Sequence, residues 1–292
     1  MPSTSVVFEG PASPGLTLAP WRRGSGDPSN RISADGAIWR TSAMATGPVT
    51  ARITKSAVGT VDCEAWGPGA AEFLDGFAAL VGAEDDAGGF DPVEPTIAHL
   101  RLGRSGRVLE ALVPAIIEQR VSGMDAWRAW RRLVTKYGAP APGPAPTGMR
   151  VPPTAEVWRR IPSWEFHRAN VDPGRARTIV GCAQRADALE RLTAERAVTG
   201  LRSLPGVGEW TAAETVQRAF GDADALSVGD YHLSTVVGRS LLGHPIDDAA
   251  MIELLEPLRP HRQRAVRLLE ASGLAHNPRF GARQAILNLR AL

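Results

Sequence analysis

The sequence predicts an α+β protein, with a small N-terminal α+β domain at residues 1–95 and an all-α region at residues 96–292. Three observations support this division. Apolar residues alternate with period two in the early part, they recur at helical spacing after Thr96, and a turn-rich connector spans Asp85–Pro95. A chain of 292 residues is long enough for two or three such modules with a sizeable core.

Two stretches of the N-terminal part have the alternation that is typical of half-buried strands. In VTARI, Val49–Ile53, every second residue is apolar, and the same holds for VDCEA, Val61–Ala65. The following segment, Ala70–Gly82, carries two phenylalanines and a leucine at helical spacing and ends in glycine. This pattern predicts one helix packed on a small sheet.

The C-terminal region is expected to consist of helices separated by caps and breakers. Arg107–Arg120 has an apolar stripe, with Pro114 predicting a kink or an early break. Ser122 is expected to cap a helix that reaches Lys136, and Ser163 is expected to cap another. Further helices are expected at residues 173–192, 194–203, 209–220, 231–242, 247–257 and 261–272.

A proline-rich segment divides the helical region into two expected subdomains. Ala139–Pro153, APAPGPAPTGMRVPP, has the composition of an extended linker. We expect it to run over the surface and to stay outside the core.

Charge and cysteine content narrow the function classes. The net charge is only +2, but nearly all positive charge is arginine, since Lys55 and Lys136 are the only lysines. Arginine suits bidentate contact with phosphate, so the composition permits a nucleic-acid partner without requiring one. Cys63 and Cys182 lie far apart, outside any CxxC motif. This excludes a four-cysteine iron–sulfur cluster and a Cys-rich zinc site, and both cysteines are expected to be buried.

Membrane association is not expected. No apolar run approaches the ~18–20 residues that cross a bilayer, and the N-terminus lacks the order of a signal peptide. We therefore expect a cytoplasmic protein.

One stretch of the helical region combines a glycine hairpin with an isolated carboxylate. LPGVG, Leu204–Gly208, lies between two expected helices, and its glycines allow a tight turn with close approach of a ligand to the backbone. The free N–H groups at the start of the next helix would bind an anion such as phosphate. Asp230 follows about twenty positions later at the start of another helix, which stabilises a carboxylate anion. The bland alternatives are an ordinary helical corner and a plain N-cap.

This arrangement resembles the helix-hairpin-helix DNA glycosylases, whose motif ends in a Gly/Pro-rich segment and an aspartate. Within that superfamily, the chain is most similar to the branch for alkylated bases, 3-methyladenine DNA glycosylase II. IIEQRVSGMDAW, Ile116–Trp127, is similar to the segment that fills the gap left by a flipped base. The residues that match the motif are Leu204, Pro205, Gly206, Val207, Gly208, Trp210, Thr211, Ala212, Asp230 and Tyr231.

The resemblance implies catalysis by Asp230. A base must leave the duplex before its glycosidic bond can be reached, and the sugar becomes positive as that bond breaks. A fixed carboxylate stabilises this charge and can orient or deprotonate the attacking water. Relatives that also cut the backbone carry a lysine where this chain has Trp210. The resemblance therefore implies a monofunctional enzyme that leaves an abasic site.

The base pocket is expected to include Trp210, Glu214 and Tyr231. Trp210 would stack on a cationic alkylated purine, or it would pack between helices. Alkylpurine relatives carry a tyrosine where this chain has Glu214. The Glu214 carboxylate could pair with the base, or it could bond to a nearby arginine. His232 is expected to lie on the surface at a helix start, or else to line the pocket.

The resemblance also implies the DNA contacts. They are expected at Gln119, Arg120, Ser122, Gly206, Val207, Gly208 and Thr211. Hairpin carbonyls around Leu204 and Val207 could hold a monovalent cation, and no other metal or cofactor is expected. The basic run His261–Gly273 is either a solvated helix face or a phosphate contact.

Two function classes remain open at this point. The first is a monomeric DNA glycosylase that acts on double-stranded DNA containing a damaged base. Its substrate would be 3-methyladenine-type purines or, alternatively, hypoxanthine, etheno adducts, uracil or mismatched bases. The second is a non-catalytic helix-hairpin-helix module, which needs the hairpin but not Asp230.

Overall fold

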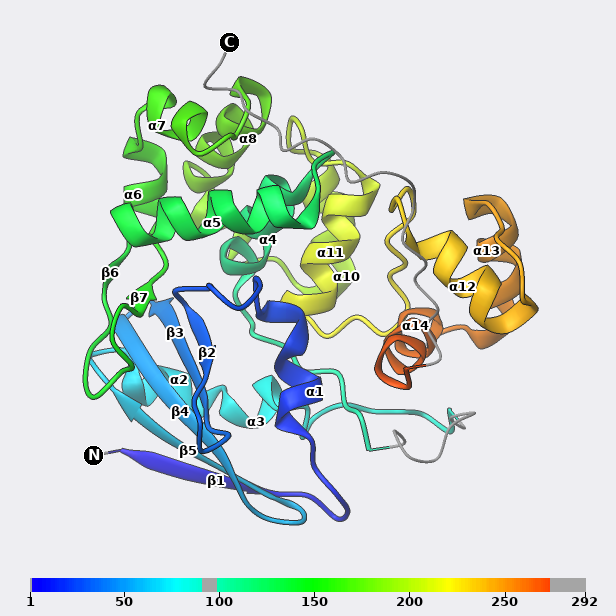
Figure 1. The fold of residues 1–292 in the computed structure, drawn as a ribbon, viewed down its shortest axis with the longest axis horizontal. Coiled ribbons are helices and arrows are strands. Elements are labelled where there is room, and N and C mark those ends of the chain that lie inside the picture. Colours follow the sequence, from blue (N-terminus) through cyan, green and yellow to red (C-terminus); the bar gives the residue numbers. More distant parts are fainter. Residues whose placement is uncertain (1, 91–98, 274–292) are drawn as a thin grey trace.

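The computed structural model describes residues 2–90 and 99–273 (Figure 1). An antiparallel sheet with a few short helices forms the N-terminal part, and a group of helices lies against one end of it (Figure 1). The sheet order is β1-β5-β4-β3-β2. Its strands are β1 (Ser3–Val7), β2 (Asn30–Ile32), β3 (Ile38–Met44), β4 (Gly47–Ala57) and β5 (Thr60–Trp66).

The sheet buries the face that the alternation predicts. The apolar residues of VTARI and VDCEA are all 1% exposed or less, and Ile53 pairs with Cys63 across β4 and β5. They pack on the expected helical segment, which is divided at Gly76 into two short helices rather than forming one. The helices of this part are α1 (Pro14–Leu18), the 3-10 turn η1 (Ala19–Trp21), α2 (Ala70–Asp75) and α3 (Phe77–Leu80).

A second core lies among the helices that follow. Leu112, Ile116, Leu133 and Ile179 are 1% exposed or less in this cluster. α4 runs through the buried Pro114 without the early break that proline suggested. The helices are α4 (Val108–Glu118), α5 (Gly123–Tyr137), α6 (Ala155–Arg160), α7 (Ser163–Arg168), α8 (Pro173–Ala183), α9 (Ala186–Leu189), α10 (Ala194–Arg202) and α11 (Glu209–Ala219).

A third apolar cluster joins the last described helices. Leu233, Met251, Leu255 and Val266 pack together in it. Figure 1 shows these helices as a group beside α10 and α11. They are α12 (Leu233–Leu242), α13 (Asp248–Leu255), the 3-10 turn η3 (Glu256–Leu258) and α14 (Arg262–Ala271).

Two helix starts test the expected caps. Ser122 caps α5, where its hydroxyl accepts a hydrogen bond from the Asp125 N–H. The prediction for Ser163 is wrong, because Ser163 is the first residue of α7 and Pro162 occupies the cap position without a side-chain hydrogen bond. The long helix expected from residue 173 to 192 is likewise divided into α8 and α9.

The proline-rich segment is more than a surface connection. It forms the two-stranded ribbon of β6 (Ala139–Pro140) and β7 (Arg150–Val151). Its end is buried, since Met149 and Val151 are 4% and 2% exposed and Met149 packs near Trp39 of the sheet. The expectation that this segment lies outside the core is therefore wrong for its C-terminal end, because the sheet supplies an apolar surface that composition does not reveal.

A buried ion-pair cluster joins the sheet to the helices. The Glu110 carboxylate of α4 pairs with Arg40 of β3 and, at 2.9 Å, with Arg107. Arg40 is 2% exposed. The expected boundary near residue 95 lies outside the described residues.

Candidate active site

The hairpin Leu204–Gly208 connects α10 to α11. Its backbone turns at Gly206, whose φ of +84° is in the left-handed region that favours glycine. A Cβ at this position would lie 2.1 Å from the Thr178 Oγ1, so a larger residue does not fit. Gly208 is the cap residue of α11, and no side chain caps that helix start. The described hairpin therefore presents backbone N–H groups at the positive end of a helix, as an anion site requires.

The loop between α4 and α5 is tied to this hairpin. The Gln119 Nε2 donates to the Gly206 carbonyl at 2.9 Å and to the Thr211 Oγ1 at 2.8 Å. Arg120 follows with a left-handed φ of +54° and an exposed side chain. Gln119, expected to contact DNA, thus joins the two loops, and Arg120 projects beside it. The preceding Glu118 pairs with Arg23 at 3.0 Å.

Asp230 is held by three hydrogen bonds just before α12. Its Oδ1 accepts from the backbone N–H groups of His232 at 2.9 Å and Leu233 at 3.1 Å. Its Oδ2 accepts from the Trp210 indole N–H at 3.0 Å. The carboxylate therefore fixes the turn that leads into α12, whose cap residue is His232, and it is also oriented by a residue twenty positions earlier. A local turn accounts for the first two bonds but not for the third.

Two residues expected in the base pocket are not among the described residues that line the cavity next to Asp230. Trp210 is half-buried and directs its indole nitrogen at Asp230, and it is absent from the described residues that line the adjacent cavity. Tyr231 is 72% exposed and makes an edge contact with the His232 ring, 4.8 Å between centroids. His232 itself lines the cavity.

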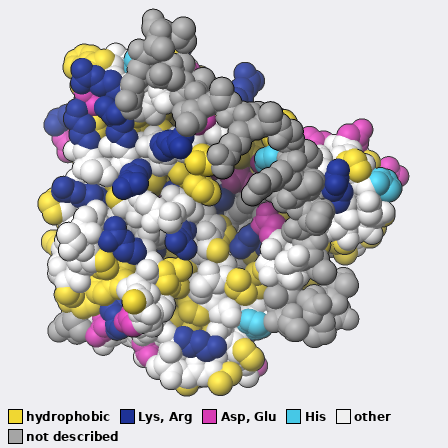
Figure 2. All heavy atoms as spheres, viewed as in Figure 1, with side chains coloured by type: hydrophobic (Ala, Val, Ile, Leu, Met, Phe, Trp, Pro, Cys, Tyr) yellow, Lys and Arg dark blue, Asp and Glu magenta, His cyan; other side chains and the backbone are white. Residues whose placement is uncertain are grey.

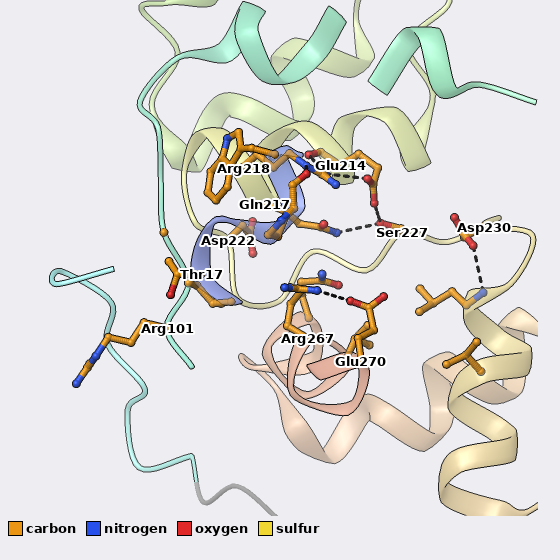
Figure 3. Close-up of a pocket in the computed structure, with 18 of the residues that line it drawn as sticks. Thr17, Arg101, Glu214, Gln217, Arg218, Asp222, Ser227, Asp230, Arg267 and Glu270 are labelled. Carbon is orange, nitrogen blue, oxygen red and sulfur yellow. Dashed lines mark hydrogen bonds and ion pairs between the residues drawn. The ribbon is translucent and has the colours of Figure 1, made fainter. Parts of the chain in front are cut away.

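A cavity of about 550 Å³ adjoins Asp230, which is enough for an extruded nucleotide. In Figure 3, Glu214 and Ser227 meet on one side of it, Arg267 and Glu270 lie together on α14, and Asp230 lies at one end. The N-terminal part closes part of the wall. Lining residues come from α1 and η1, the loop 101–103, α11, the loop after α11, the start of α12, and α14; they are Thr17, Pro20, Trp21, Arg101, Leu102, Gly103, Glu214, Gln217, Arg218, Asp222, Ser227, Asp230, His232, Leu233, Val236, Gln263, Val266, Arg267 and Glu270.

Glu214 is bonded to protein groups within this wall. Its carboxylate pairs with Arg218 at 2.8 Å and accepts from the Ser227 hydroxyl at 2.5 Å. Burial alone would raise the pKa of the Glu214 carboxyl, but the Arg218 guanidinium and the Ser227 hydroxyl lower it by more. The net pKa lies below its ordinary value, so Glu214 is an anion neutralised by its own helix. Of the alternatives open from the sequence, the structure favours the bond to a nearby arginine.

Comparisons with known proteins were made on sequence and on structure. No family model matches the chain. The probable bifunctional transcriptional activator/DNA repair enzyme AlkA of Mycobacterium tuberculosis is 32% identical over 181 residues, which cover 58% of this chain and 34% of that protein. The chain thus spans about a third of the length of the curated relative that it matches.

Two solved structures superpose over nearly the whole chain. A 3-methyladenine DNA glycosylase from Archaeoglobus fulgidus has a TM-score of 0.72 at 17% identity, covering 91% of this chain and 97% of that one. An 8-oxoguanine glycosylase/lyase from Clostridium acetobutylicum has a TM-score of 0.69 at 15% identity, covering 92% and 96%. The fold is that of the helix-hairpin-helix DNA glycosylases. The predicted α+β fold class, with a sheet domain before the helices, is confirmed.

Within this helix-hairpin-helix fold, several cavity residues were not found from the sequence. Trp21 and Gln263 are separated by more than 240 positions, and nothing local marks either one. Arg218 could have been found, because it lies one helical turn after Glu214 on α11. The Arg267–Glu270 pair at 2.5 Å is also a helical neighbour pair.

The basic run on α14 fits neither of its two expected roles at its most buried residues. Arg262 and Arg264 are 9% and 3% exposed. Arg262 pairs with Asp224 at 2.6 Å, and Arg264 pairs with the buried Asp85 at 2.6 Å. These arginines bind the last described helix to the rest of the protein. Figure 2 shows lysine and arginine side chains interspersed over this face of the molecule, without one continuous basic stripe.

The described residues contain no cluster of three or more histidine, cysteine, aspartate or glutamate side chains that could hold a metal ion. Cys63 and Cys182 are buried and free, as expected. Burial raises the pKa of their thiols to about 12 and about 11. None of the described helices is long and apolar enough to span a membrane.

Proposed function

We propose that this protein is a DNA N-glycosylase that hydrolyses the glycosidic bond of an extruded damaged base. The observation that carries the proposal is Asp230, a carboxylate fixed by three hydrogen bonds at the edge of a cavity of about 550 Å³. The hairpin, with its uncapped helix start, lies in the same fold. These are the parts that base removal from duplex DNA requires.

In this mechanism the hairpin binds the DNA backbone without reading sequence, because its donors are backbone groups. Arg120 enters the gap left by the flipped base, and Gln119 holds its loop against the hairpin. As the glycosidic bond breaks, positive charge develops on the sugar, and the fixed Asp230 carboxylate stabilises it and orients water. Water attack then releases the base and leaves an abasic site.

We further propose that the enzyme is monofunctional. Strand cutting by a Schiff-base mechanism needs an amine near the sugar. The chain has two lysines, Lys55 and Lys136. Lys55 lies in β4, and Lys136 pairs with Glu165 at 2.7 Å; neither lines the cavity. Alkylated purines of the 3-methyladenine type are the first substrates to assay, in keeping with the name of the Archaeoglobus structure.

The test compares the wild type with Asp230→Asn on methylated duplex DNA. Free bases are resolved by chromatography, and strand integrity is measured without added alkali. The expected result is base release by the wild type alone, with intact strands, while duplex affinity is unchanged in the variant. Asp247→Asn is the matched control, since Asp247 likewise accepts from a backbone N–H near a helix start, that of Ala250 in α13 at 2.8 Å.

Three outcomes separate the alternatives. Strand breaks without alkali would contradict the monofunctional assignment. Release of hypoxanthine, uracil, an etheno adduct or a mismatched base, in place of alkylated purines, would replace the substrate and keep the chemistry. Binding without release of any base would leave a DNA-binding module and refute the enzyme.

A further inference from the structure

Three buried polar atoms of the cavity residues have no hydrogen-bond partner, and one of them, the Arg101 Nε, belongs to a guanidinium that lies over the Phe8 ring. The other two are the Gln263 Oε1 and the Trp21 Nε1. Both residues line the cavity, and they are 6% and 7% exposed. Buried polar groups are nearly always satisfied in proteins, because an unmade hydrogen bond is costly. Two such atoms in one cavity are thus free to bond to a ligand that enters it.

Charged groups of the same wall are already bonded within the protein. Arg267 pairs with Glu270 at 2.5 Å, and the Asp222 Oδ1 accepts two backbone N–H groups at 2.8 and 2.9 Å. Glu214 is held by Arg218 and Ser227, as described above. Of the four carboxylates among the described lining residues, Glu214 and Glu270 are thus paired with arginines, whereas Asp222 and Asp230 accept hydrogen bonds from neutral N–H groups. The two glutamates of this wall therefore offer a cationic base no unpaired anion.

We propose that Gln263 and Trp21 recognise the extruded base, and that the preferred base is a neutral purine with an N–H donor beside a carbonyl acceptor. This inference rests on the proposed glycosylase function. A primary amide presents one acceptor and two donors, and a half-turn of the amide exchanges their positions. It is therefore complementary to the N–H and C=O of a lactam edge. The Trp21 indole N–H supplies a further donor for a ring nitrogen or a second carbonyl lone pair.

The aromatic content of the wall agrees with recognition by hydrogen bonds. Among the described lining residues, Trp21 and His232 carry aromatic rings, whereas Trp210 is engaged with Asp230. A box of several aromatic faces, which attracts cationic bases through the ring quadrupoles, is absent from this part of the chain. Sites built to hydrogen-bond a polar edge discriminate strongly against bases that leave their groups unpaired.

The experiment measures single-turnover base release from two duplexes, one with hypoxanthine and one with 7-methylguanine. Both bases carry the lactam edge, but only 7-methylguanine is cationic as a nucleoside. The wild type is expected to release hypoxanthine faster. Gln263→Leu should slow hypoxanthine release at least about tenfold, because the lactam edge loses both partners. Trp21→Phe should slow it by a smaller factor.

Gln263→Glu keeps the size of the side chain and adds an anion to the wall. It should lower hypoxanthine release and raise 7-methylguanine release, so that the ratio of the two rates falls at least about tenfold. Gln184→Leu is the matched control, because Gln184 is an exposed glutamine at the end of α8. Thermal unfolding of each variant checks that the fold is kept.

The outcomes distinguish this inference from the proposed function. Faster release of 7-methylguanine by the wild type would overturn the inference and leave the glycosylase intact. The inference also fails, with the glycosylase intact, if the Gln263 variants change both rates equally or neither rate. If the wild type releases no base from these duplexes or from methylated DNA, the proposed function fails and this inference fails with it.

Discussion

The hydrogen bond from Trp210 to Asp230 makes a quantitative prediction for the variant Trp210→Phe. Phenylalanine keeps most of the apolar contact of the half-buried ring but removes the N–H that donates to Oδ2 at 3.0 Å. A hydrogen bond to a charged group contributes about 1.5–3 kcal/mol. Two backbone N–H groups still hold Oδ1, so we expect a loss near the lower end. A loss of about 2 kcal/mol in the transition state slows the reaction roughly 30-fold.

The assay is single-turnover base release at saturating enzyme, with duplex affinity measured separately. Trp210→Phe should lower the rate constant and leave the enzyme concentration at half-maximal rate unchanged, because the indole orients the catalytic carboxylate and does not bind the base. Trp164→Phe is the matched control, since Trp164 is a 61% exposed tryptophan on α7. A rate within about threefold of the wild type, or a loss of affinity at an unchanged rate, would refute this role for Trp210.

Two further predictions concern the hairpin and the buried ion pairs. Gly206→Ala should weaken duplex binding and lower the melting temperature, because the added Cβ meets Thr178 and the φ of residue 206 is +84°. A calorimetric scan measures the melting temperature and a titration measures duplex affinity; unchanged values of both would contradict the prediction. Burial raises the pKa of Glu110, but Arg107 and Arg40 lower it by more, to about 2 from an ordinary 4.5. The stabilising contribution of the ionised Glu110 carboxylate is therefore present above pH 4.5 and is lost as the pH falls towards 2. Glu110→Gln should remove this part of the pH dependence of stability, measured by urea unfolding. At neutral pH the same substitution should cost about 3–5 kcal/mol of stability, because it leaves Arg40 buried without its anion.

Local features of the sequence were sufficient where one element determines its own structure. The alternation in Val49–Ile53 predicts the buried face of β4, and Ser122 predicts the start of α5. The α+β class follows from how these patterns are distributed along the chain. The hairpin and the aspartate were found together because both lie within one short segment, Leu204–Asp230.

Contacts between residues far apart in the sequence could not be predicted from periodicity, caps or turn residues. Trp210 was expected to stack on a base or to pack between helices. Its indole bond to Asp230 was not predicted, because that bond depends on how the loop before α12 folds back. The pairing of Ser3 with Glu64 places the N-terminal strand beside β5, and no periodicity indicates it. Similarly, Met149 is buried because the sheet lies next to the proline-rich segment, and not because of its neighbours in sequence.

The side-chain amide of Gln119 connects two segments from distant parts of the chain, the loop after α4 and the hairpin before α11. Its two hydrogen bonds, to Gly206 and Thr211, couple the backbone next to Arg120 to the hairpin. In the proposed function, the hairpin then binds the DNA backbone at the same time as Arg120 contacts the base stack. Each binding event on the duplex would therefore bring Arg120 into contact with the base stack at that site. Weakly stacked bases would leave the duplex most readily, so the rigidity of the connection between the two segments would help to select which lesions reach the cavity.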